Sequence, residues 1–240
     1  MSFSYPVGIV GICTLAHRAA QSGASVRLIK PDLDDTANYL SRARLPVVLD
    51  RLGVAHDLPH VRERNVGRAL LELRTFESVR EAEALAEHLH GIVESNNKRN
   101  ADLLYKALCE TGANVLDHSR VRHGYLMAQM THGGDLVHFA VGDAGVGMLA
   151  TLRELGAVDD SSALDLASAT GVSATRQRGR GNGLRDLADQ ATRSRGEVTV
   201  QSGSATRSER GRTGAAPQIT RRSFAHAIHG TLISGSLGAA

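Results

Sequence analysis

The sequence predicts an α/β protein of the α+β type, a two-layer sandwich whose four- or five-stranded mixed sheet is covered by helices on one face. Three observations predict it. Apolar residues recur at helical spacing within residues 7–20, 79–93 and 101–118. Apolar runs of strand length occupy residues 125–130 and 136–141. Hydrophobic residues make up 42% of the 240-residue chain, which is ordinary for a protein with a buried core.

Residues 1–62 are predicted to form a small α/β unit that precedes the sandwich. Its first helix, over residues 7–20, ends before Gly23, because glycine readily adopts the backbone conformation that terminates helices. A short strand follows, and then two short helices separated by Pro46, at residues 25–29, 36–44 and 47–52.

Residues 63–240 are predicted to form the larger unit. In chain order we expect a strand, two helices, a β-hairpin, a mixed segment, a helix and two strands, at residues 69–76, 79–93, 101–118, 124–141, 150–178, 183–192, 197–201 and 231–234. The hairpin is expected to turn at residues 133–135. Residues 203–220 contain few apolar side chains and are predicted to form a mobile loop.

The charge of the chain favours no particular polymer partner. The net charge is +3, and much of the excess comes from arginines near the C-terminus: Arg193, Arg195, Arg207, Arg210, Arg212, Arg221 and Arg222. Aromatic residues make up only 3%, so stacking on bases is poorly supplied. We expect a solvated, partly mobile basic loop, and a nucleic-acid interface is the least favoured function.

The cysteines and histidines indicate neither a disulfide scaffold nor a zinc site. Cys13 and Cys109 lie far apart, which is typical of reduced, buried thiols in a cytosolic protein. The eleven histidines form no HExxH or paired ligand pattern. The apolar stretch at residues 6–16 is too short to span a bilayer, and no basic residue precedes it. We therefore predict a cytoplasmic protein without a membrane partner.

The first of three short motifs is Glu110-Thr-Gly-Ala-Asn114, on the predicted helix that ends at residue 118. Four residues make just over one helical turn, so the carboxylate and the amide project from the same face. Leu104, Leu108 and Val115 mark the face toward the core. Alone, this spacing is most often found on the solvated face of a surface helix.

The second motif, Asp143-Ala-Gly145-Val-Gly147, directly follows an apolar strand. A carboxylate at a strand end, followed by two glycines, places an acceptor beside backbone that a ligand can approach closely. By itself the pattern is also that of a plain turn.

The third motif, Gly179-Arg-Gly181-Asn-Gly183, opens the helix predicted at residues 183–192. A glycine-rich loop that leads into a helix offers free N–H groups and a favourable dipole to phosphates. The dinucleotide fingerprint would need a preceding strand and a βαβ unit, and neither is predicted here. No GK[ST] sequence of a Walker motif occurs.

Together the three motifs resemble the N box and the two glycine boxes of the GHKL superfamily, which includes DNA gyrase, histidine kinases and anti-sigma-factor kinases. The N box of anti-sigma-factor serine kinases is especially similar to the string from Ala107 to His118, and His229-Gly230-Thr231 resembles the closing Gly-Thr element. The resemblance covers about residues 68–236. It implies a Bergerat-type ATP-binding fold and Mg-ATP as the ligand.

The resemblance also implies a role for each motif residue. Asp143 would accept a hydrogen bond from the adenine amino group, with Thr231 assisting through water. Asn114 would ligate Mg²⁺, and Glu110 would polarise the attacking nucleophile. The glycines of the second and third motifs (Gly145, Gly147, Gly179, Gly181 and Gly183) would present backbone to the nucleotide, and residues 150–178 would form a lid.

Glu110 further separates two branches of the superfamily. Sensor histidine kinases usually carry Asn at this position, whereas the ATPases and serine kinases carry Glu. A phosphoacceptor role for His56 is discounted, because Pro59 and a nearby predicted strand leave no room for a helical hairpin.

Residues 1–62 resemble, more weakly, the second half of a STAS domain, the fold of anti-sigma-factor antagonists. The similarity rests on the run from Gly8 to Ala20, on residues 23–28, and on a helix containing Tyr39 and Leu40. None of residues 5–7, where the resemblance places that family's phosphoacceptor serine, is a serine, so this unit is a poor candidate for the kinase's own substrate. The alternative is a simple packing appendage.

Two uses of Mg-ATP stay open at this stage. The chain is an ATPase switch or a Ser/Thr protein kinase that acts on a regulatory partner protein, or it is a non-catalytic signalling module that only binds ATP. A homodimer is also left open.

Overall fold

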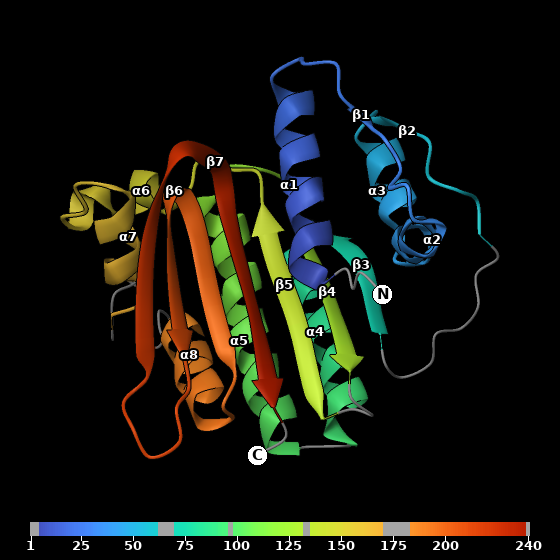
Figure 1. The fold of residues 1–240 in the computed structure, drawn as a ribbon. Helices are drawn as coiled ribbons and strands as arrows, with labels where there is room; N and C mark the ends of the chain where they lie inside the picture. The colour runs from blue at the N-terminus through green and yellow to red at the C-terminus, as the bar shows by residue number, and fades with distance from the viewer. Residues whose placement is uncertain (1–4, 62–69, 96–97, 132–134, 170–182, 239–240) are drawn as a thin grey trace.

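The computed structural model describes residues 5–61, 70–95, 98–131, 135–169 and 183–238. Helices surround a five-stranded sheet with the strand order β3-β4-β5-β7-β6 (Figure 1). The strands are β3 (Leu70–Phe76), β4 (Gly124–Thr131), β5 (Leu136–Asp143), β6 (Glu197–Arg210) and β7 (Gln218–Gly238). The α+β class is therefore confirmed.

All four strand pairings are antiparallel, so the prediction of a mixed sheet was wrong. Strands β5 and β6 run in the same direction, but β7 lies between them and pairs antiparallel with both. The order of strands in a sheet depends on contacts distant in sequence, which hydrophobic periodicity does not report.

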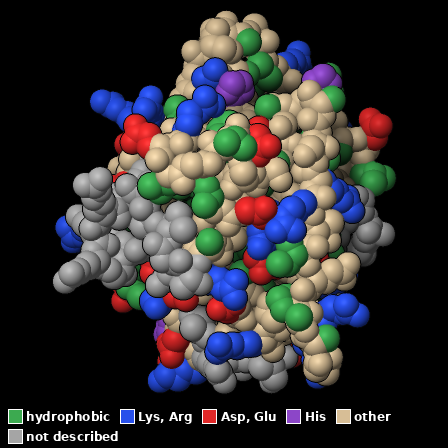
Figure 2. Space-filling view, turned by 90° about the vertical axis from the view of Figure 1, so that its left-hand side faces the viewer, with side chains coloured by type: hydrophobic (Ala, Val, Ile, Leu, Met, Phe, Trp, Pro, Cys, Tyr) green, Lys and Arg blue, Asp and Glu red, His purple; other side chains and the backbone are tan. Residues whose placement is uncertain are grey.

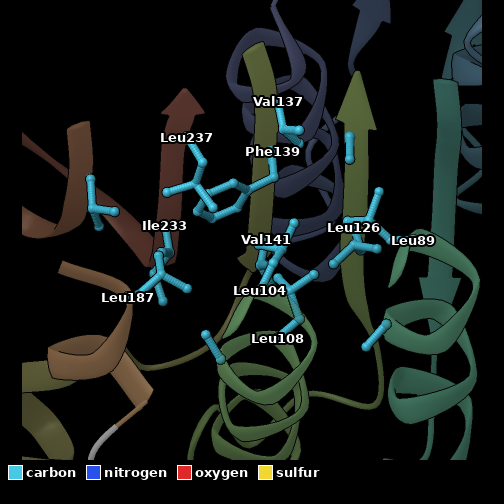
Figure 3. Close-up of a cluster of buried hydrophobic side chains, with 14 of the residues drawn as sticks. Leu89, Leu104, Leu108, Leu126, Val137, Phe139, Val141, Leu187, Ile233 and Leu237 are labelled. Atoms are coloured by element: carbon cyan, nitrogen blue, oxygen red, sulfur yellow. The ribbon is translucent and has the colours of Figure 1, made fainter. Parts of the chain in front are cut away.

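Three helices cover one face of the sheet, and we call this the helix-covered face. They are α4 (Val79–Glu94), α5 (Lys98–His118) and α8 (Gly183–Arg193). Leu104, Leu108 and Leu187 pack there against Val141 and Ile233 (Figure 3). The polar run predicted to separate the first two helices does so, since α4 ends at residue 94 and α5 begins at residue 98.

The N-terminal helix α1 (Pro6–Gln21) packs on the opposite face, which we call the back face (Figure 1). Val10 and Cys13 share a core there with Tyr125 and Leu232. The prediction that helices cover only one face was therefore wrong. Strands β4 and β5 are apolar on both sides, which is the pattern of a doubly covered sheet.

The rest of the N-terminal unit follows the predicted order. Helices α2 (Asp34–Arg42) and α3 (Leu45–Arg51) lie beside a small parallel pair, β1 (Arg27–Leu28) with β2 (Ala55–His56). Neither cysteine forms a disulfide, and Cys13 is fully buried. Within the described residues, no helix combines the length and apolarity needed to cross a bilayer.

Strands β6 and β7 include residues 203–210 and 218–220 of the predicted mobile loop, so the loop prediction was wrong for these residues, and only residues 211–217 connect the strands. Strand β6 turns back at Gly203 (φ 59°), which brings the Thr199 and Ser208 hydroxyls within 2.7 Å of each other. The first half of β7 pairs with the returning half of β6, as in Arg207 opposite Arg221, before β7 arches to the centre of the sheet (Figure 1).

Buried charges explain why the loop prediction failed. Arg207 is only 8% exposed, and its guanidinium lies 3.1 Å from Asp165 and 2.9 Å from Glu209. Ion pairs thus fill the place that apolar residues would take in an ordinary strand. For Arg207 the expectation of a solvated side chain was wrong.

The first part of the predicted lid is helical. It contains α6 (Met148–Leu152), the 3₁₀ helix η3 (Arg153–Leu155) and α7 (Asp160–Ala167). The Asp160 carboxylate accepts hydrogen bonds of 2.8 Å from the backbone N–H and the hydroxyl of Ser204, so α7 is tied to β6. The remainder of that segment, from residue 170, lies outside the described residues.

Candidate functional site

Three polar side chains lie side by side where the apolar part of the helix-covered face ends. Thr231 of β7 pairs with Asp143 of β5 on one side and with Ser202 of β6 on the other. Side chains alternate along a strand, and the residues two positions earlier or later (Val141, Ile233 and Val200) belong to the core beneath the helices. Asp143, Thr231 and Ser202 therefore face the helix layer together, and we call them the polar row.

Asp143 is the most constrained member of the row. Its side chain is 3% exposed, and its Oδ1 accepts a 2.8 Å hydrogen bond from the Gly145 N–H. Burial raises the pKa of this carboxyl to about 6, although hydrogen bonds from the Gly145 and Thr231 backbones act in the opposite direction. The result is a fixed carboxylate with acceptor capacity left over.

Backbone segments approach so closely around Asp143 that two glycines are sterically required. A Cβ on Gly145 would lie 2.1 Å from the Ser119 carbonyl oxygen, and one on Gly230 (φ 89°) would lie 1.9 Å from the Asp143 carbonyl oxygen. Gly147 also has a positive φ, 78°. These glycines thus have a structural reason of their own: Gly145 and Gly230 are buried against neighbouring backbone, whereas Gly147 is partly exposed.

Ser202 is a member of the row that the sequence did not reveal. Its Oγ accepts a 2.9 Å hydrogen bond from the Met148 N–H and donates a 3.1 Å hydrogen bond to the Gly230 carbonyl. It therefore joins the N-terminus of α6 to the turn that precedes Thr231. The alternation of apolar and polar residues that continues after Val198 and Val200 could have identified Ser202 as part of the strand.

Glu110 and Asn114 both lie on α5, as predicted, with Leu104, Leu108 and Val115 buried on its sheet-facing side. Asn114 is exposed. The Glu110 Oε2 atom is buried and has no hydrogen-bond partner among the described residues, and the same holds for the hydroxyl of its neighbour Thr111. Such orphan atoms are uncommon in folded proteins and call for an explanation.

The contacts between α5 and α8 show what lies near Glu110. Asn100 accepts a hydrogen bond from Gln190, and the Lys106 ammonium lies 3.1 Å from the Asp186 carboxylate. The two helices therefore run antiparallel. On this register the first turn of α8, residues 183–186, is level with residues 104–109 of α5, so Glu110 lies just past the N-terminal end of α8, where helical N–H groups have no helical acceptor.

The structure thus unites part of the predicted site. Asp143, Gly145, Gly147 and Thr231 are adjacent, and the Val146 N–H joins them to the end of α5 through a 3.0 Å hydrogen bond to the Ser119 carbonyl. Glu110 and Asn114 stand on that same helix. Gly183 is the first residue of α8, whereas Gly179 and Gly181 lie outside the described residues.

Metal ligands are sparse in this region. In the parts of the chain that the structure describes, no three His, Cys, Asp or Glu side chains cluster as a metal site would require. A divalent ion here would need Asn114 together with oxygens from a ligand or water.

Comparison with known proteins assigns no family. No family model matches the sequence, and no curated protein matches it. The function must therefore be argued from the site itself.

Proposed function

We propose that this protein binds Mg-ATP between the polar row and the N-terminal turn of α8. The observation that carries the proposal is the buried, oriented Asp143 carboxylate beside Thr231, Gly145 and Gly147 at the end of β5. A rigid acceptor at a strand end, close in sequence to the partly exposed Gly147, is suited to a flat, hydrogen-bonding ring such as adenine.

Asp143 would recognise the base. Adenine presents an amino group as a donor, whereas guanine carries an acceptor oxygen at the equivalent position. With a pKa of about 6, Asp143 is mostly ionised at pH 7 and can accept from the amino group. Thr231, paired with Asp143 across β5 and β7, is placed to assist through water.

The phosphates would lie toward α8 and α5. The first turn of α8, beginning at Gly183, supplies free N–H groups and the positive end of the helix dipole. Asn114 would hold Mg²⁺, an ion that commonly takes only one or two protein ligands beside phosphate oxygens and water. Contributions from Gly179 and Gly181 remain predictions of the sequence.

Glu110 would serve the phosphoryl-transfer step. Its orphan Oε2 can accept a hydrogen bond from a water or a hydroxyl, which orients that nucleophile. We propose an ATPase switch or a Ser/Thr protein kinase acting on a regulatory partner. A binding module without turnover is the outcome if no transfer is found.

Isothermal titration of the full chain tests the proposal. Mg-ATP and Mg-ADP should bind, and Mg-GTP should bind at least tenfold more weakly. Asp143→Asn should weaken ATP binding, whereas Asp34→Asn, which removes a carboxylate that is 85% exposed on α2, should not. Equal affinity for ATP and GTP, or an unaffected Asp143→Asn variant, would refute adenine recognition by this row.

A further inference from the structure

The first half of β7 forms an open edge of the sheet. Residues 218–223 pair with residues 205–210 of β6 through six consecutive partners, and among the described residues no strand pairs with their other side. Ile219 and Phe224 are 41% and 47% exposed. Figure 2 faces the side of the molecule on which this edge lies. We call residues 218–224 the β7 edge.

The β7 edge carries positive charge that the protein does not neutralise. Arg221 is compensated by Asp165, at 2.9 Å, and this carboxylate also lies 3.1 Å from Arg207. Arg222, however, is exposed and forms no ion pair with any described residue. Arg212, in the turn between β6 and β7, is likewise exposed and forms no ion pair with a described residue.

The edge also lacks the usual devices that block strand addition. Proteins protect open edges by keeping them short, by inserting proline, or by bulges. Here six residues pair regularly, none of them is proline, and the irregularity of the β6–β7 ladder lies between Ser202 and Ala205, beyond them. Positive charge is the one such device present on these residues. It repels basic partners and attracts acidic ones.

A second copy of the chain is a poor partner for this edge. Antiparallel pairing of two copies about Arg221 would set the Arg221–Arg222 pairs of both copies against each other. Like charges on neighbouring strands destabilise the pairing. A segment of opposite charge has no such conflict.

We propose that the β7 edge docks an extended acidic segment of a partner protein, which adds to the sheet as a further strand. Backbone hydrogen bonds to residues 218–223 would hold the segment, and its carboxylates would pair with Arg222. Phe224 lies two residues from Arg222 on the same side of the strand, so an apolar residue beside the acidic one fits this side. The proposal does not depend on nucleotide binding.

Fluorescence anisotropy with the full chain and a labelled eight-residue peptide of alternating Glu and Val tests the proposal. Binding should be saturable and should weaken at least fivefold between 0.05 and 0.5 M salt, because exposed ion pairs are screened. Arg222→Glu should weaken it at least tenfold. Arg80→Glu, an exposed change on α4, is the matched control and should leave binding unchanged.

Three further probes separate strand addition from simple attraction. The same peptide with every backbone nitrogen methylated keeps its charge but has no N–H group on either edge with which to pair as a strand, so it should not bind. A Lys-Val peptide should not bind either. Equal binding of either control peptide, or no binding of the Glu-Val peptide at 1 mM, would overturn the proposal.

Two rival occupants have their own signatures. A single-stranded oligonucleotide whose binding depends on Arg222, in place of the peptide, would identify a nucleic-acid interface and overturn the proposal. Concentration-dependent dimerisation that excludes the Glu-Val peptide would identify a second copy as the occupant and overturn it as well. Circular dichroism of Arg222→Glu should match the wild type, which ties any loss of binding to the edge.

Discussion

The two faces of the central sheet carry polar clusters at the same end, where Tyr125 of β4 pairs with Gly142 of β5. On the back face, His17 of α1 has both ring nitrogens partnered, Nδ1 with the Tyr125 hydroxyl at 2.9 Å and Nε2 with Gln21 at 3.2 Å. On the helix-covered face lies the polar row, and on α5, Glu110 and Thr111 each hold a buried polar atom without a hydrogen-bond partner among the described residues.

The difference separates a structural cluster from a candidate site. His17 itself has both ring nitrogens partnered and stacks on His123 with ring centroids 4.7 Å apart, although the buried Nδ1 of His123 has no hydrogen-bond partner among the described residues. A buried polar atom left unpaired costs about 1–3 kcal/mol, so two of them in consecutive residues of α5 call for an explanation, and the ligand proposed above would supply one. This comparison is one reason for placing the proposed site on the helix-covered face.

The largest expected effect concerns Glu110. Glu110→Ala should keep near-normal ATP affinity but lower turnover at least tenfold, because general-base contributions are typically about 10²–10⁴-fold. Phosphate release and partner phosphorylation measure turnover, and titration measures affinity. Glu87→Ala, an exposed change on α4, is the control.

Asn114→Ala should behave differently from Glu110→Ala, losing the Mg-dependent part of ATP binding because the metal loses a ligand. If Glu110→Ala turns over like the wild type, the role given to Glu110 is wrong. If the wild type shows no turnover with any partner tested, the protein is a binding module.

The second largest expected effect is a loss of ATP affinity when Asp143 is protonated. Its pKa of about 6 means that the acceptor carboxylate is lost as the pH falls from 7 to 5, so affinity should fall toward tenfold per pH unit below 6. Titration calorimetry across this range measures the slope. Asp143→Asn should retain only the slope that comes from the ATP phosphates, and an identical slope in both proteins would exclude Asp143.

Replacement of Ser202 should have a smaller effect on ATP binding. Ser202→Ala removes the acceptor for the Met148 N–H, and a lost hydrogen bond that leaves a buried partner costs about 1–3 kcal/mol. ATP binding should weaken severalfold, since the turn between Asp143 and α6 loses its tie to β6. Ser208→Ala, on the same strand but paired with Thr199, should not change it. Equal affinities would leave Ser202 a purely structural residue.

The sequence predicted those parts of this site that depend on local pattern. Helix α5 and the β4–β5 hairpin have strong periodicity, so Glu110, Asn114 and Asp143 were placed on the correct elements. Ser202 was missed because β6 was expected to end at residue 201. The position of β7 between β5 and β6, which brings Thr231 to Asp143, depends on contacts that no local pattern encodes.

The last prediction concerns the back face and the pH dependence of stability, where no effect on ATP binding is expected. Burial, together with the nearby His123, lowers the pKa of His17 to about 4, so its contribution is present above pH 6.5 and is lost as the pH falls toward 4. The pKa of Asp143 is raised, so this residue acts in the opposite direction. Its contribution to the stability of the fold is lost as the pH rises from 3.8 to about 6. The two slopes partly cancel in the wild type.

His17→Gln removes one of these slopes and keeps a polar partner for Tyr125. Urea denaturation at pH 7, 6 and 5 should then show stability rising on acidification by up to about 1.4 kcal/mol per pH unit relative to the wild type. An unchanged pH profile would mean that the pKa of His17 does not differ between the folded and unfolded states in this pH range. ATP affinity at pH 7 should be unaffected, because His17 lies on the back face.

Amide chemical-shift mapping with Mg-ATP tests the central claim, nucleotide binding on the helix-covered face, most directly. The ¹H–¹⁵N signals of Gly145, Gly147, Ser202 and Thr231 should move as Mg-ATP is added and saturate with a single affinity, while those of His17 and Gln21 on the back face stay in place. Shifts confined to the back face or to the β7 edge, or no shifts at millimolar Mg-ATP, would contradict the account.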